Sequence, residues 1–271
     1  MEYSVLMTVY GKDHPEYFRL ALMSMVMQTK KPDEIVIVKD GPITEMLQNV
    51  IDNVEKDYPD LIVQLQLEHN MGLGLALNEG IRVCNNELIA RMDADDISLS
   101  DRCEKQVAEF ENNNNLDIVG CPVLEFVGNP NNIVGKRDVP IDNDAIYKYC
   151  KKRDPFNHPT VMFRKSKVEA VGGYGDFRKN QDTDLWIKLL SNGAVCKNLP
   201  EYLLKFRFDK GTYKKRKNWL NTKLLIIIRW NAYKTKFCSI FDFLEVAIAQ
   251  LAVFLLPITF QEFIYKKVLR R

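Results

Sequence analysis

Short apolar runs alternate with amphipathic stretches through the first hundred residues, and this alternation constrains the fold more than any other feature of the chain. Four runs have the length and composition of buried strands: Val5–Val9, Glu34–Val38, Ile62–Leu67 and Glu87–Met92. Helical spacing of apolar residues fills the intervals, over Pro15–Gln28, Glu45–Lys56 and through Ala76–Ile81. Strands that alternate with helices predict an α/β fold, with a mostly parallel, Rossmann-like sheet flanked by helices.

Polar side chains follow each of these strands. Tyr10, Asp40, Asn70 and Asp93 all stand at or just after a strand end. Ligands of open parallel sheets bind at the carboxyl ends of the strands. We therefore expect these four side chains to converge on one edge of the sheet.

The most acidic of these strand ends is Arg91-Met92-Asp93-Ala94-Asp95-Asp96. Three carboxylates within four residues repel one another, and a bound cation relieves that repulsion. Carboxylate oxygens suit Mg²⁺ or Mn²⁺, which often bridge to phosphate. The alternative is an acidic turn in which Asp96, with Ser98 or Ser100, caps the next helix. We favour the metal site because the cluster follows a buried strand.

Two neighbouring segments permit more than one reading. Asp40 is suited to accept hydrogen bonds from a base or a ribose, or to form the turn before Gly41-Pro42. The small residues between Asn70 and Gly80 do not have the spacing of a dinucleotide fingerprint. They predict close packing of a helix on the sheet more strongly than contact with a ligand.

A second acidic segment, Gln181-Asp182-Thr183-Asp184-Leu185-Trp186, precedes a helical pattern. Asp182 could remove a proton from an acceptor hydroxyl, and Trp186 could stack on a sugar face. Equally, Asp182 or Asp184 could cap the helix, with Trp186 in the core. His158 is a further candidate for acceptor binding, although a single histidine in a loop is more often structural.

The last quarter of the chain has a different character. Residues 205–271 contain 15 Lys/Arg and 4 Asp/Glu, whereas residues 1–204 are net acidic. Basic clusters beside apolar runs favour an interfacial membrane helix over a core helix pair. The charge-free stretch 246–260 is too short to span a bilayer. Six scattered cysteines predict reduced thiols, and Tyr3–Met7 predicts a buried strand and no secretory signal.

Together these segments resemble the family-2 glycosyltransferases with the GT-A fold, over roughly residues 3–200. The order and spacing of the motifs carry the resemblance: Ser4–Tyr10, Gln28-Thr29 with Pro32–Val38, Asp40-Gly41, Asn70–Asn78, Ala90–Asp96, Asn157-His158-Pro159, Gly172-Gly173-Tyr174 and Gln181–Trp186.

The resemblance implies a role for each matching residue. Tyr10, Asp40, Asn70, Arg91, Asp93 and Asp95 match positions that bind the nucleotide sugar. Asp95 matches the metal ligand of the D-x-D motif, with Asp93 assisting. Asp182 matches the general base, and Gln181 stands where the family often has Glu. Residues 1–204 would form the catalytic domain, with a nucleotide-binding half (1–100) and an acceptor half (101–204). Residues 205–271 would form a membrane-interfacial tail.

The resemblance also implies a reaction. It predicts an inverting transfer of a hexose from a UDP-sugar to a polyprenyl-pyrophosphate-linked sugar in O-antigen or capsule assembly, with a β-linkage. Processive relatives carry Q-x-x-R-W; here Arg229-Trp230 follows Ile226, which predicts transfer of a single sugar. The expected location is the cytoplasmic face of a bacterial inner membrane, with no nucleic-acid partner. The alternatives are a sugar-nucleotide pyrophosphorylase and a non-catalytic sugar-nucleotide-binding module.

Overall fold

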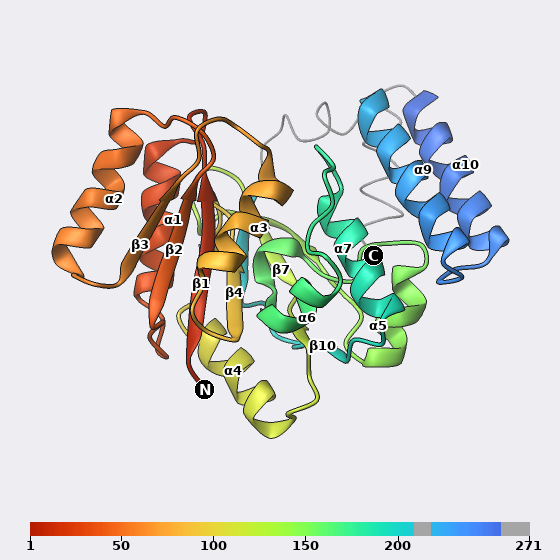
Figure 1. Ribbon diagram of the computed structural model, residues 1–271, viewed down its shortest axis with the longest axis horizontal. Helices are drawn as coiled ribbons and strands as arrows, with labels where there is room; N and C mark the ends of the chain where they lie inside the picture. The colour runs from red at the N-terminus through yellow and green to blue at the C-terminus, as the bar shows by residue number, and fades with distance from the viewer. Residues whose placement is uncertain (209–217, 256–271) are drawn as a thin grey trace.

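The computed structural model describes residues 1–208 and 218–255, which form an α/β fold around one large sheet (Figure 1). The order of the seven strands in that sheet is β10-β6-β9-β4-β1-β2-β3. They are β1 (Tyr3–Val9), β2 (Glu34–Lys39), β3 (Ile62–Gln66), β4 (Leu88–Met92), β6 (Ile118–Gly120), β9 (Met162–Arg164) and β10 (Cys196–Asn198).

The predicted, mostly parallel sheet is confirmed. β1 pairs in parallel with both β2 and β4, and β2 pairs in parallel with β3. β9 is the exception, because it runs antiparallel to β4 and β6 between which it lies. β9 thus joins the two predicted halves of the catalytic domain, residues 1–100 and 101–204, in a single sheet.

A smaller sheet has the strand order β5-β11-β7-β8. Its strands are β5 (Ile97–Ser98), β7 (Val123–Phe126), β8 (Ile133–Arg137) and β11 (Leu204–Arg207). The apolar residues between 117 and 128 form two strands, β6 and β7, that belong to different sheets. Pro122 lies between them and has no N–H for a strand ladder.

Helices cover both faces of the large sheet (Figure 1). One buried cluster contains side chains of α1, α2 and α4, and the other contains side chains of α3, α5, α6, α7 and α9. The helices are α1 (Pro15–Val26), α2 (Glu45–Asp57), α3 (Leu73–Val83), α4 (Arg102–Asn112), α5 (Asn143–Cys150), α6 (Lys165–Ala170), α7 (Gln181–Ser191), α9 (Trp219–Lys234) and α10 (Ile240–Leu255).

Glycines bring α3 close to the sheet and to α7, as the sequence predicted. A Cβ on Gly80 would lie 2.4 Å from Leu6 Cδ1 and 2.7 Å from Val38 Cγ2. A Cβ on Gly74 would lie 3.1 Å from Gln181 Cβ on α7. These small residues therefore allow helix packing.

At the other end of the chain, α9 and α10 lie side by side beyond α7 and α5 (Figure 1). None of the described helices is both long and apolar enough to cross a membrane. The predicted start of the tail at residue 205 divides β11, so the sheet-forming part of the chain continues past it. The basic run 214–217 and residues 256–260 of the charge-free stretch lie outside the described residues.

Candidate active site

The acidic cluster lies where β4 ends, at the carboxyl edge of the central strands. Asp93, Asp95 and Asp96 each offer a carboxylate oxygen, and these atoms all lie within 4.8 Å of one another. Asp96 does not cap a helix, because α4 begins after Asp101. Three oxygen donors at this spacing fit a hard divalent cation such as Mg²⁺ or Mn²⁺.

Two arginines adjoin the cluster. Arg91 is 1% exposed and forms an ion pair with Asp93. Its buried guanidinium is therefore paired with one carboxylate of the cluster, and the predicted role of Arg91 in binding the nucleotide sugar stays a prediction. Arg207 of β11 donates its backbone N–H to Asp96 Oδ1 at 2.7 Å and its Nε–H to the Asp95 carbonyl at 2.8 Å.

Desolvation and mutual repulsion raise the pKa of Asp95 and of Asp96. Desolvation and repulsion by Asp93 raise the pKa of Asp95 to about 6. The same two causes, with Asp95 added, raise the pKa of Asp96 well above its usual range. The Asp96 Oδ2 atom is buried and has no hydrogen-bond partner among the described residues. Such uncompensated negative charge is the electrostatic condition that a cation relieves.

Asp13 adds a fourth carboxyl that sequence reasoning missed. Burial raises its pKa to about 7, opposed by a hydrogen bond from the Tyr10 N–H, and repulsion by Asp95 and Asp93 contributes. Asp13 lies in the turn between β1 and α1, and no strand-end pattern marks it. The only signal in the sequence is its position three residues after Tyr10.

The predicted nucleotide-binding residues converge on this edge as expected. The Asp40 carboxylate accepts hydrogen bonds from the N–H groups of Met71 and Gly72, at 2.7 and 3.1 Å. It also accepts one from the Asn70 side chain at 2.8 Å. Tyr10 is 41% exposed, and desolvation, Asp13 and Asp95 raise the pKa of its hydroxyl. Asp40 therefore fixes the loop after β3, while Tyr10 presents an open ring near the acidic cluster.

Asp182 lies in the first turn of α7 and is half-buried. Its Oδ1 accepts the N–H of Thr183 at 3.0 Å. Desolvation and repulsion by Asp154 raise its pKa to about 7, although Arg91 acts in the opposite direction. Asp182 does not cap α7, since the helix begins after Asn180. A carboxylate with a pKa near neutrality has the basicity that general-base catalysis requires.

The two predicted acceptor-binding residues belong to the core instead. Trp186 is fully buried, with its ring edge-on to Phe156 at 5.1 Å between centroids. His158 is also buried, and its Nε2 lies 2.8 Å from the Tyr174 hydroxyl. Burial and Arg91 hold the pKa of His158 well below its usual value. Of the two roles that the sequence left open for Trp186, burial of the whole indole favours the core role over stacking on a sugar.

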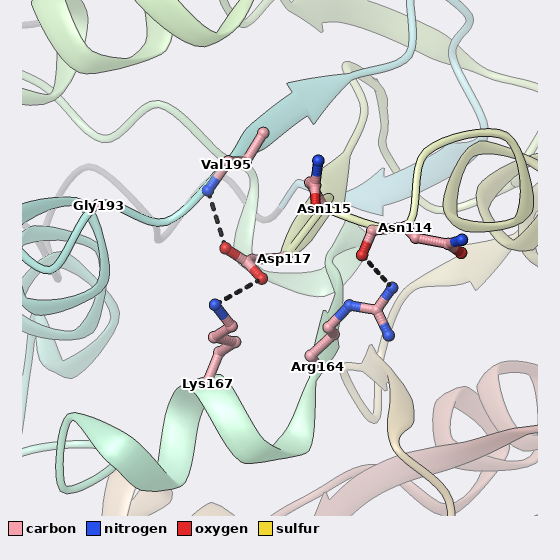
Figure 2. A pocket seen from close by; sticks show the side chains of 7 residues that line it. All are labelled: Asn114, Asn115, Asp117, Arg164, Lys167, Gly193 and Val195. Atoms are coloured by element: carbon pink, nitrogen blue, oxygen red, sulfur yellow. Dashed lines mark hydrogen bonds and ion pairs between the residues drawn. The ribbon is translucent and has the colours of Figure 1, made fainter.

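A surface pocket lies away from these residues (Figure 2). It opens near the start of β6 and the end of the antiparallel β9, at the edge opposite the acidic cluster. Asp117 in this pocket accepts the Val195 N–H and pairs with Lys167 at 3.3 Å, while Arg164 donates to the Asn114 carbonyl (Figure 2). Internal partners thus satisfy the charges of this pocket.

The sequence model of the family described as "Glycosyl transferase family 2" matches residues 4–172. The chain belongs to the family-2 glycosyltransferases. A UDP-Gal:alpha-D-GlcNAc-diphosphoundecaprenol beta-1,3-galactosyltransferase of Escherichia coli is 39% identical over 270 residues, which cover 100% of this chain and 97% of that protein. The amylovoran biosynthesis glycosyltransferase AmsE of Erwinia amylovora is 38% identical, with 80% of each chain covered.

Solved structures confirm the predicted GT-A-like fold. TarS of S. aureus, in complex with UDP-GlcNAc, has a TM-score of 0.61 at 17% identity, with 84% of this chain and 65% of that chain covered. The mannosyltransferase of Pyrobaculum calidifontis, in complex with GDP-Man and Mn²⁺, has a TM-score of 0.63 at 16% identity, with 93% and 74% covered. The chain is a glycosyltransferase, and the pyrophosphorylase and the non-catalytic module are set aside.

Proposed function

We propose that this glycosyltransferase moves one hexose from a UDP-sugar to a polyprenyl-pyrophosphate-linked sugar, with inversion to a β-linkage, in O-antigen or capsule assembly. The observation that carries the proposal is the pairing of two acidic groups around one buried arginine. Arg91 forms an ion pair with Asp93 and also lowers the pKa of Asp182. The donor-side carboxylates and the candidate base therefore share one buried guanidinium as an electrostatic neighbour. The printed activity of the Escherichia coli relative supports the choice of donor and acceptor.

In the proposed reaction, Asp182 takes the proton of the acceptor hydroxyl. The hydroxyl oxygen forms a bond to the anomeric carbon from the face opposite the diphosphate. The bond between that carbon and the UDP oxygen breaks, and its electron pair leaves with UDP. A single displacement inverts the configuration, so an α-linked donor gives a β-linked product.

Asp95, with Asp93 and Asp96, would hold Mn²⁺ or Mg²⁺. A divalent cation at this position would stabilise negative charge on the departing diphosphate. Arg207 adds positive charge beside the same carboxylates and lowers the pKa of Asp95. Excess EDTA should abolish transfer, and added Mn²⁺ or Mg²⁺ should restore it. Full activity in the chelator would contradict the metal site.

We further propose that the α9–α10 hairpin rests on the cytoplasmic face of a bacterial inner membrane. Five exposed apolar side chains of α10 recur at intervals of three and four residues and so share one face of the helix: Phe241, Leu244, Ile248, Leu251 and Leu255. The basic composition of residues 205–271 favours an anionic surface. A lipid-linked acceptor would reach the site from that surface.

The test of the proposed reaction is a panel of UDP-hexoses offered with GlcNAc-pyrophosphate-lipid, with products read by mass spectrometry. We expect one donor to give a product larger by one hexose or N-acetylhexosamine. Asp182→Asn should lower turnover by about 10² or more, while donor affinity by calorimetry stays within about twofold of wild type. Glu169→Gln, on the exposed side of α6, is the matched control. Near-normal turnover of Asp182→Asn would show that another group is the base.

A further inference from the structure

The C-terminal hairpin contacts the surroundings of Asp182 at two points of α9. The Asn180 side chain, two residues before Asp182, donates to the carbonyl and side-chain oxygens of Asn221 at 3.3 and 3.2 Å. Two turns further along α9, Arg229 reaches the segment that follows α5. The hairpin therefore packs directly against the N-terminal end of the helix that carries the candidate base.

Arg229 is a buried charge with a specific anionic neighbour. Its side chain is 2% exposed, and one terminal nitrogen donates to the Cys150 carbonyl at the end of α5. The other, Nη2, lies 3.8 Å from Asp154 Oδ1. A buried guanidinium is costly unless a negative charge and hydrogen bonds compensate it. Asp154 supplies that charge, although its own side chain is 41% exposed.

Thr183 connects Asp154 to the base. The Thr183 hydroxyl donates to Asp154 Oδ1 at 2.7 Å, and the N–H of the same residue donates to Asp182 Oδ1 at 3.0 Å. Thr183 is fully buried, so it has little freedom to break either bond. Thr183 thus donates a hydrogen bond to each of two carboxylates, Asp154 and Asp182. Asp154, the more exposed of the two, also lies beside the Arg229 guanidinium.

We propose that Asp154 and Arg229 are positioning residues for the general base Asp182, and that through them α9 holds that base in its reactive orientation. The inference rests on the proposed function, which assigns the proton transfer to Asp182. Asp154 and Thr183 fix the direction of the base, and Arg229 fixes Asp154. The hairpin is then part of the catalytic unit as well as a docking surface.

The charges around Asp182 affect its pKa, so the proposal predicts how the pKa of Asp182 changes in each variant. Asp154 raises the pKa of Asp182 by repulsion, and Arg91 lowers it. Tyr174 also faces this group, since Asp182 raises the pKa of the Tyr174 hydroxyl. Removal of the Asp154 charge should therefore make the base weaker. Removal of the Arg229 charge leaves the Asp154 carboxylate uncompensated and should make Asp182 harder to deprotonate.

The experiment compares Asp154→Asn and Arg229→Gln in the full chain, with kcat and both KM values measured as a function of pH. Asp154→Asn keeps an oxygen for Thr183 but loses the charge. We expect kcat to fall roughly fivefold to tenfold, with donor KM unchanged and the acid limb of the kcat profile moved to lower pH. Arg229→Gln should move that limb to higher pH, and Arg229→Lys should restore most of the wild-type profile.

Opposite shifts of the acid limb separate a positioning role from a merely structural one, which would lower activity without moving the limb. Asp144→Asn, an exposed carboxylate of α5, is the matched control and should change nothing. If Arg229→Gln fails to fold, Asp154→Asn still tests the inference, because the Asp154 side chain is partly exposed and its substitution disturbs the core less. An unmoved limb and an unchanged kcat in Asp154→Asn would overturn the inference. Near-normal turnover of Asp182→Asn would instead overturn the proposed function.

Discussion

At the scale of single residues, the carboxyl of Asp182 sets an expected pH dependence of transfer. Its pKa is raised to about 7, and only the deprotonated form can accept the proton of the acceptor hydroxyl. As the pH falls through 7 the base becomes protonated, so kcat should fall about tenfold between pH 8 and pH 6. The measurement is kcat from pH 5.5 to 9, at saturating donor, acceptor and metal. A flat profile down to pH 5.5 would contradict the assignment of this base.

A substitution of Trp186 tests whether this side chain stabilises the core or binds the acceptor sugar. Because the indole is fully buried beside Phe156 and His158, Trp186→Ala should lower the free energy of unfolding by about 3–5 kcal/mol. Trp219→Ala is the matched control, since that indole is 53% exposed and its loss should cost about 0.5 kcal/mol or less. Denaturant unfolding measures both. A stable Trp186→Ala with a raised acceptor KM would restore the sugar-stacking interpretation.

The sequence predicts well the position of those candidate site residues that follow long buried strands. Tyr10, Asp40 and Asn70 converge as predicted because adjacent parallel strands end at one edge. Asp154 was not predicted, and Arg229 was noted only beside Trp230 with no role near Asp182. Both residues come from segments whose place beside Asp182 depends on tertiary packing. Trp186 was ambiguous for a different reason: an aromatic residue one turn into a helix has the same spacing whether it faces the core or a ligand.

At the scale of elements, the contact of α3 with the sheet depends on Gly80. A Cβ there would meet Leu6 Cδ1 at 2.4 Å and Val38 Cγ2 at 2.7 Å, both on fully buried side chains. Gly80→Ala should therefore lower the free energy of unfolding by about 1–3 kcal/mol, despite the better helix propensity of alanine. Glu79→Ala, which loses an exposed ion pair with Arg82, should cost less than about 0.5 kcal/mol. Equal stability of the two variants would mean that α3 can shift without cost.

The strands differ in how well the sequence alone predicts them. β1, β2, β3 and β4 were predicted to within two residues, since each combines an apolar run with a turn signal. β5, β8 and β11 were not predicted. β5 has two residues, β8 is largely exposed, and β11 pairs with strands far away in the sequence. Short strands of this kind owe their stability to neighbours that local periodicity does not encode.

At the scale of the whole molecule, acidic and basic character divide along the chain. Residues 1–204 carry the acidic excess, and residues 205–271 carry 15 Lys/Arg against 4 Asp/Glu. The apolar face of α10 lies in the basic portion, next to α9, which contacts α7. The hairpin therefore connects this apolar face, through α9, to α7, the helix that carries Asp182. This arrangement suits an acceptor whose sugar is anchored by a lipid.

That arrangement predicts binding to anionic membranes through α10. Sedimentation with phosphatidylglycerol vesicles should capture the full chain, and less of it at high salt, because ions screen the basic residues. Phe241→Ser with Ile248→Ser removes two side chains that are 79% and 65% exposed. Since burial of one large apolar side chain contributes about 1.5–3 kcal/mol, the double variant should bind at least about tenfold more weakly.

Two exposed apolar residues of β8 give the matched control for that experiment. Ile133→Ser with Val134→Ser removes side chains that are 40% and 44% exposed on the smaller sheet, and vesicle binding should be unchanged. Sedimentation of the wild-type chain without lipid tests the alternative that a second copy of the protein covers the α10 face. A chain that self-associates through Phe241 and Ile248 and ignores vesicles would assign this face to a second copy of the protein. Binding to vesicles by a monomer would assign the α10 face to the membrane.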